Sequence, residues 1–301
     1  MTSTAPAKGK TALVLFFHGL GDSGSSWTML PSQIRRAMSW ISWSFPNAPR
    51  QPVSCNFGAV MSSWFDLRAI PVPAAEHHSG LDKAVKDVHK MLKDAEAQGF
   101  SADRIVLGGF SQGGCLALQA GLTAPSPIGG IIVLSGWASA DLVNAKVHKS
   151  TPIFIGHGVD DDVVPISSMQ KTLKVLKGLD CNGVRSRTFK NLGHSASPEE
   201  FRAVGELLAE VLPEAKPVVK ASTAPKHTSK IEGAVCCVEV SFASVKGLVL
   251  EISPTQLRLS GTIPGAQPLC IDWKAKVNTE QAHARFSKSK KLLRVKAAVV
   301  Q

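Results

Sequence analysis

The chain has 301 residues and carries 34 Lys and Arg against 23 Asp and Glu, a formal net charge of +11. This length can hold one large domain, or one medium and one small domain. The charge is uneven, because residues 1–214 contain 20 basic and 18 acidic residues whereas residues 215–301 contain 14 and 5. The basic character therefore belongs to the C-terminal part of the chain.

Cysteine and histidine spacing argues against disulfides and against a metal site. The six cysteines form neither a dense framework nor a Cys-x-x-Cys pair, so we expect free thiols in a reducing compartment. His77 and His78 have no further partners at metal-ligand spacing, and we expect both on the surface.

The sequence also lacks recognisable targeting signals. Residues 1–10 are polar and predict a disordered N-terminus, and the apolar run that follows, residues 12–17, is too short for a membrane span. The ends carry neither a Met-Gly start nor a prenylation box. We therefore expect a soluble, cytoplasmic protein.

Residues 11–213 alternate between short apolar runs and amphipathic segments. The apolar runs are rich in branched side chains and predict buried parallel strands at residues 12–17, 105–109, 130–135 and 153–156. The amphipathic segments predict surface helices at residues 79–98, 166–177 and 198–212, the last one capped by Ser197. This alternation predicts an α/β fold in which helices cover a mostly parallel sheet.

The first predicted strand ends in a glycine-rich turn. His18-Gly-Leu20-Gly-Asp22 follows it directly. Such a turn can aim a backbone N–H at a developing oxyanion, so the N–H of Leu20 is a candidate donor. We expect a structural role for His18, which lies at a strand end, and for His157, which follows a later strand.

Residues 104–118 carry the most specific motif. An apolar segment leads into Gly109-Phe-Ser111-Gln112-Gly113, and a helical pattern begins directly after it. Strand, G-x-S-x-G and helix in this order are the nucleophile elbow of α/β-hydrolases. The strained turn lifts the serine hydroxyl above the sheet, and residues larger than the flanking glycines would clash. Ser111 is therefore the candidate nucleophile, and the N–H of Gln112 is a second candidate oxyanion donor.

Two later segments supply the other groups that a serine nucleophile needs. His194 lies in a loop between a predicted strand, residues 184–190, and the last predicted helix. Because a serine hydroxyl is a poor nucleophile without an adjacent base, His194 is the candidate base. A carboxylate must orient the imidazole, and three consecutive aspartates follow a buried strand at the sheet edge where ligands bind. Spacing alone leaves Asp160, Asp161 and Asp162 open.

The C-terminal part has a different pattern. Residues 214–230 are polar, without aromatic residues or periodicity, and predict a linker. After them the apolar residues recur with period two, which is typical of short antiparallel strands. We predict a small antiparallel β-sandwich over residues 231–301, with turns at residues 246–247, 253–254 and 265.

Six segments of residues 11–213, in chain order, resemble the acyl-protein thioesterase / lysophospholipase family, also called the phospholipase/carboxylesterase family. They are residues 17–24, 46–49, 63–66, 108–114, 135–137 and 157–165. In that family the acid lies four residues before the proline of the last segment, a position that corresponds to Asp161. The family's serine and histidine correspond to Ser111 and His194.

This resemblance implies hydrolysis of acyl thioesters on palmitoylated proteins, or of lysophospholipids and small carboxylic esters, through an acyl-serine and without metal or cofactor. It also implies an apolar channel for the acyl chain. Trp137 and Val163 match channel positions of the family, and residues 64–73, with Trp64, Leu67 and Ile70, predict a lid or wall. Because each buried methylene contributes about 0.8 kcal/mol to binding, such a channel would favour long acyl groups.

The tail resembles, by pattern alone, the CS-type β-sandwich of chaperone cofactors, in particular PIH-type assembly factors. The segments that carry this resemblance are residues 238–240, 257–260, 269–272 and 284–295. The resemblance implies a chaperone partner and an alternative function as an adaptor with an inactive hydrolase scaffold. The basic charge of the tail favours an acidic protein partner. Basic residues 288–296 could instead make transient contact with anionic membranes. Because few aromatic residues lie among the lysines, nucleic-acid binding is disfavoured.

Overall fold

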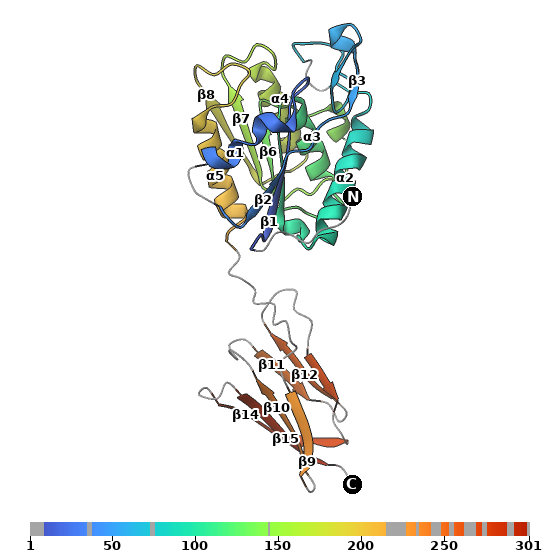
Figure 1. Cartoon of the computed structure of the whole chain (residues 1–301), viewed down its shortest axis with the longest axis vertical. Helices are drawn as coiled ribbons and strands as arrows, with labels where there is room; N and C mark the ends of the chain where they lie inside the picture. Colours follow the sequence, from blue (N-terminus) through green and yellow to red (C-terminus); the bar gives the residue numbers. More distant parts are fainter. Residues whose placement is uncertain are drawn as a thin grey trace. The chain divides into compact units, whose positions relative to one another are not determined.

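The chain divides into two compact units, Met1–Lys216 and Pro217–Gln301 (Figure 1). The computed structural model describes residues 9–34, 38–72, 76–143 and 145–214 of the first unit. In the second unit it describes residues 227–232, 235–241, 248–252, 256–261, 269–272, 276–287 and 292–299. Residues 1–10, for which the sequence predicts disorder, lie mostly outside the described residues.

A six-stranded parallel sheet forms the centre of the first unit, in the order β2-β1-β5-β6-β7-β8. The strands are β1 (Ala12–Phe17), β2 (Ile41–Ser44), β5 (Ile105–Phe110), β6 (Gly130–Leu134), β7 (Ile153–Gly158) and β8 (Val184–Phe189). Neighbouring strands pair in parallel; for example, Leu13 of β1 lies opposite Ile105 of β5, and Gly158 of β7 lies opposite Phe189 of β8. The predicted α/β architecture is confirmed.

Helices cover both faces of this sheet (Figure 1). They are α1 (Leu30–Gln33), α2 (Leu81–Ala97), α3 (Gln112–Leu122), α4 (Ile166–Gly178) and α5 (Pro198–Val211), with 3-10 turns η1 (Gly24–Trp27), η2 (Ser54–Asn56), η3 (Ala102–Arg104) and η4 (Ala140–Leu142). Alternate side chains of β1 enter different cores: Leu13 packs with α2, α3 and α4, whereas Val14 packs with α1 and α5. This period of two is what a strand buried on both faces requires.

Two features of the first unit were not predicted. The edge strand β2 reads Ile-Ser-Trp-Ser and is only half-buried, so it lacks the continuous apolar run that marks the central strands. A separate antiparallel hairpin joins β3 (Arg50–Val53) and β4 (Ala59–Ser62). Its residues are mostly exposed or half-buried, and Pro52 weakens a strand prediction.

The second unit contains two antiparallel sheets, in the orders β14-β15-β10-β9 and β11-β12-β13. The strands are β9 (His227–Glu232), β10 (Val235–Ser241), β11 (Leu248–Ile252), β12 (Gln256–Gly261), β13 (Leu269–Asp272), β14 (Val277–Ser287) and β15 (Leu292–Val299). Leu257 from one sheet and Val295 from the other are fully buried. The predicted antiparallel β architecture is therefore confirmed, while its predicted turns lie outside the described residues.

The predicted linker, residues 214–230, overlaps the first strand of the second unit. Strand β9 begins at His227 and pairs with β10 along its whole length, from Val240↔His227 to Val235↔Glu232. The sequence His-Thr-Ser-Lys is polar on both faces, so periodicity could not reveal a strand whose place is set by backbone pairing with a neighbour.

Helix α5 begins as predicted at a Ser197 cap and buries an acidic residue in its first turn. The hydroxyl of Ser197 accepts a hydrogen bond from the Glu200 N–H at 3.1 Å. The carboxyl of Glu200 is fully buried, and neither oxygen has a hydrogen-bond partner among the described residues. It lies against Gly156 of β7, where an added Cβ would be 2.4 Å from Glu200 Oε1. Burial raises the pKa of Glu200 to about 8; the backbone of Ser197 opposes the rise and the Asp161 charge adds to it.

We predict that Glu200 makes the first unit less stable as the pH rises from about 5 to 8. An unfolded chain ionises this carboxyl near its ordinary value of 4.5, while the folded chain retains the proton until about pH 8. Since one pKa unit corresponds to about 1.4 kcal/mol, the loss amounts to a few kcal/mol.

The measurement is the free energy of unfolding by urea at several pH values, for the wild type and Glu200→Gln. The variant should lack this pH-dependent loss, because its carboxamide does not ionise. Parallel pH profiles for the two proteins would contradict the prediction. Glu206→Gln, at an exposed position of the same helix, is the control.

Candidate active site

Ser111 occupies a strained turn between β5 and α3. Its backbone has φ 54° and ψ −119°, a conformation that residues other than glycine rarely adopt. Its N–H donates a hydrogen bond to the Leu134 carbonyl at 2.8 Å. A Cβ on Gly109 would lie 2.2 Å from the carbonyl carbon of Gly113, and one on Gly113 would lie 2.1 Å from the Phe17 carbonyl oxygen. The helix can therefore approach the sheet only with glycine at both positions, as the elbow motif predicts.

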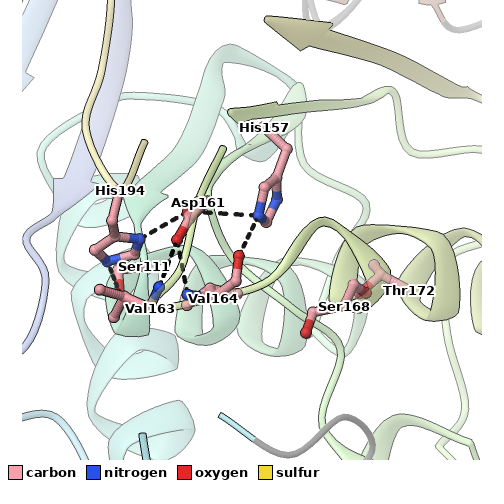
Figure 2. Close-up of polar contacts among 8 residues, drawn as sticks. All are labelled: Ser111, His157, Asp161, Val163, Val164, Ser168, Thr172 and His194. Carbon is pink, nitrogen blue, oxygen red and sulfur yellow. Dashed lines mark hydrogen bonds and ion pairs between the residues drawn. The ribbon is translucent and has the colours of Figure 1, made fainter. Parts of the chain in front are cut away.

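The structure brings Ser111, His194 and Asp161 together from three separate segments (Figure 2). His194 Nε2 lies 2.9 Å from Ser111 Oγ, and His194 Nδ1 lies 2.8 Å from Asp161 Oδ2. Ser111 precedes α3, Asp161 follows β7, and His194 lies between β8 and α5. All three lie beyond the carboxyl ends of parallel strands, where open α/β sheets bind ligands.

Asp161 is held as an ionised acceptor. Its Oδ1 accepts hydrogen bonds from the N–H groups of Val163 at 3.0 Å and Val164 at 2.8 Å, while Oδ2 faces His194. Burial by itself would raise the pKa of Asp161, but the bonds from His194 and Val164 outweigh it and lower the pKa below its ordinary value. Asp160 and Asp162 are exposed, so of the three candidate aspartates it is Asp161 that meets the histidine.

His157 and His18 have the structural roles expected of them. His157 is buried behind the acid, with Nε2 2.7 Å from the Val164 carbonyl and 3.5 Å from Asp161 Oδ2. Burial lowers its pKa, so the ring is neutral and donates from Nε2 to Val164. His18 is also fully buried and accepts the Ala48 N–H at Nε2 at 3.0 Å.

The two candidate oxyanion donors, the N–H groups of Leu20 and Gln112, belong to segments next to Ser111. Gln112 is the first residue of α3, a position whose N–H has no partner within the helix. The turn at residues 18–21 passes beside the elbow, since a Cβ on Gly19 would lie 3.5 Å from Ser111 Cβ. Among the described residues neither the Leu20 N–H nor the Gln112 N–H has an acceptor. Both are therefore available to an oxyanion, and the N-terminus of α3 favours negative charge there.

The predicted acyl-contact residues separate into two groups. Trp64, Leu67 and Trp137 are buried in the core that contains α2, α3 and α4, whereas Ile70 is 48% exposed and Val163 is half-buried. A substrate can reach the second group without rearrangement of the core.

His78 is a correction to the sequence analysis, which expected it on the surface. The ring is buried, stacks on Phe65, and accepts the indole N–H of Trp137 at 2.9 Å. Burial lowers the pKa of His78 and keeps it neutral. The partners are 59 residues apart in the chain, so no local pattern could indicate the pair.

The described residues lack both a metal-binding cluster and a membrane-spanning helix. They contain no group of three or more His, Cys, Asp or Glu side chains arranged to hold a metal ion. No helix among them is long and apolar enough to cross a bilayer.

Comparison with known proteins agrees with this geometry. Residues 3–212 match the Phospholipase/Carboxylesterase family. Acyl-protein thioesterase 1 of Gibberella zeae is 37% identical over 216 residues, which cover 67% of this chain and 92% of the relative. A probable carboxylesterase SOBER1-like of Arabidopsis thaliana is 40% identical over 201 residues, 63% of this chain and 74% of the relative.

The first unit also resembles a solved structure of a related protein. The crystal structure of Arabidopsis thaliana SOBER1 superposes with a TM-score of 0.63 at 36% identity, covering 67% of this chain and 99% of that one. Through residues 3–212, which carry the elbow, the aspartate and the histidine, the chain belongs to the phospholipase/carboxylesterase family.

Proposed function

We propose that the chain is a serine hydrolase that cleaves acyl thioesters or carboxylic esters through an acyl-serine intermediate. The observation that carries the proposal is the unbroken line of hydrogen bonds from Ser111 Oγ through His194 to Asp161. His194 Nε2 takes the hydroxyl proton as Oγ attacks the acyl carbonyl, and Asp161 stabilises the imidazolium that forms. His194 then gives the proton to the leaving thiol or alcohol, and a water molecule hydrolyses the acyl-serine with the same base.

The backbone N–H groups of Leu20 and Gln112 are the proposed oxyanion hole. They belong to two turns that lie side by side at the nucleophile, and hydrogen bonds from them would strengthen as negative charge develops on the carbonyl oxygen. Such preorganised donors stabilise the transition state more than the bound substrate, which is the requirement for faster turnover.

The proposed substrates are S-acylated proteins, with lysophospholipids and small carboxylic esters as the second class. Several relatives that cover two thirds of this chain are named acyl-protein thioesterase 1, and others are named carboxylesterase. We propose Ile70 and Val163 as acyl-contact residues, and Val163 packs against the core that contains Trp64, Leu67 and Trp137. The alternative role as a chaperone adaptor finds no support in these relatives.

We predict that Ser111→Ala abolishes hydrolysis of both a long-chain acyl thioester and a lysophospholipid. The variant lacks the attacking oxygen, so turnover should fall by about 10⁴-fold or more. The measurement is product release by purified protein, and the ratio of the two wild-type rates ranks the substrate classes. Ser195→Ala, which removes an exposed hydroxyl beside His194, is the control and should retain activity. Equal rates for Ser111→Ala and wild type would overturn the proposed function.

We predict that Asp161→Asn lowers kcat by about 10³–10⁴-fold, because an amide can hold the wrong imidazole tautomer and does not stabilise the imidazolium. Asp160→Asn and Asp162→Asn remove neighbouring exposed carboxylates and should leave kcat within about twofold. Steady-state kinetics on one thioester compare the three variants. A loss in either exposed variant as large as that of Asp161→Asn would contradict the assignment of the acid.

For the second unit we propose contact with an anionic membrane surface, which would bring the hydrolase to acylated substrates. The exposed side chains of Arg285 and Arg294 lie opposite each other across β14 and β15, and the exposed Lys296 lies two residues beyond Arg294 on the same face of β15. On its other side Arg294 lies opposite Glu239 of β10. A negatively charged membrane surface would attract this group of exposed cations. A CS-type module that binds an acidic protein partner is the other proposal for this unit.

We predict that Arg285→Glu/Lys296→Glu weakens binding of the full chain to vesicles containing phosphatidylserine, at low salt, by about tenfold or more, since each basic residue near such a surface contributes about 1 kcal/mol. Sedimentation with vesicles of varied phosphatidylserine content measures the affinity. Lys90→Glu/Lys93→Glu, a matched charge reversal on α2, is the control. Unchanged vesicle binding in the first variant would contradict membrane contact through this face.

A further inference from the structure

A buried segment, residues 62–65, connects the two loops that carry the candidate oxyanion donors. On one side it contacts the carboxamide of Gln112, which is fully buried. Gln112 Oε1 accepts the Trp64 N–H at 3.0 Å, and Nε2 donates to Ser63 Oγ at 3.0 Å and to the Phe65 carbonyl at 2.7 Å. The side chain of the residue after the nucleophile therefore uses both its oxygen and its nitrogen to hold this segment.

On its other side the same segment holds the turn that contains Leu20. The indole N–H of Trp64 donates to the His18 carbonyl at 2.8 Å, and the Ser62 carbonyl accepts the Gly21 N–H at 2.8 Å. These two bonds lie on either side of the Gly19–Leu20 peptide. The Trp64 ring is itself fixed, because it is buried and packs edge-to-face on Phe17 with centroids 5.3 Å apart.

His18 sets the direction of the peptide between these anchors. Its Nε2 accepts the Ala48 N–H, so the proton of the ring is on Nδ1, which donates to the Gly19 carbonyl at 2.7 Å. The Gly19 carbonyl and the Leu20 N–H belong to one planar trans peptide and point in opposite directions. A hydrogen bond that fixes the carbonyl therefore also fixes where the Leu20 N–H points.

We propose that His18, Trp64 and the carboxamide of Gln112 are positioning residues of the oxyanion hole, which hold the Leu20 N–H in a fixed orientation relative to the Gln112 N–H. The inference rests on the proposed hydrolase function and deepens it. Trp64 thus acts through the backbone of residues 18–21. A small displacement of the Leu20 N–H would reduce turnover strongly, because a shift of catalytic groups by about 1 Å can lower the rate about 10²-fold.

The first test is Trp64→Phe, which keeps an aromatic ring and removes the indole N–H. We expect kcat for a short-chain ester to fall about 10-fold or more with little change in KM, because a misplaced donor weakens transition-state binding selectively. A trifluoromethyl ketone is the second probe, since its adduct with Ser111 places an alkoxide in the oxyanion hole. Its inhibition constant should rise by the same factor as kcat/KM falls.

Matched controls separate positioning from general loss of stability. Trp40→Phe removes an equivalent indole bond, from Nε1 to the Leu212 carbonyl at 2.9 Å, at a position remote from the site. Gln112→Glu removes the two donated bonds while keeping an acceptor for Trp64, and Gln119→Glu changes another buried glutamine of α3. Gln112→Glu also tests the proposal if Trp64→Phe fails to fold.

The outcomes are distinct. A fall in kcat with weaker ketone inhibition in Trp64→Phe or Gln112→Glu, and neither effect in Trp40→Phe or Gln119→Glu, supports the proposal. Folded Trp64→Phe and Gln112→Glu with wild-type kcat and inhibition would overturn it and leave the hydrolase function standing. A wild type no more active than Ser111→Ala would overturn the proposed function and this inference together.

Discussion

The strained turn at Ser111 is the constraint on which the arrangement of the first unit depends. A positive φ at a serine is costly, and it persists only where the surrounding packing leaves no alternative. Here the packing comes from the close approach of α3 to β5, which leaves no space for a side chain at Gly109, and to β1, which leaves none at Gly113. The same approach brings the N-terminus of α3 beside the turn after β1. Nucleophile and both candidate oxyanion donors are thus consequences of one steric condition.

Two buried carboxyls show how the environment decides charge within one part of the fold. Asp161 and Glu200 both lose contact with water, and burial acts on the pKa of each in the same direction. Asp161 recovers the lost solvation through the Val163 and Val164 N–H groups and His194, so it stays ionised. Glu200 has no comparable donors in the described part of the chain and stays protonated at neutral pH. The charged carboxyl is the one aligned with the histidine.

Local signals predicted much of this structure, and the failures share a physical cause. The central strands, the elbow and the position of His194 follow from apolar runs, glycine placement and chain order, which are all visible over a few residues. The choice among Asp160, Asp161 and Asp162 depends on which carboxylate the turn after β7 directs at His194, 33 residues away. The His78–Trp137 pair, the edge strand β2 and the start of β9 likewise depend on partners distant in the chain.

Trp64 illustrates how a residue can be noticed in the sequence for one reason and be important in the structure for another. Its indole N–H is bound to the His18 carbonyl and its ring packs on Phe17, so the side chain belongs to the support of the site. The proposed acyl-contact residues are instead Ile70 and Val163, and the Val72 N–H joins their two segments by a bond to the Val163 carbonyl at 3.3 Å. Because the Val163 N–H also donates to Asp161, one short stretch of backbone supports both the proposed acyl-contact surface and the acid. The backbone of Val163 is therefore bonded both to the acid and to the segment that carries Ile70.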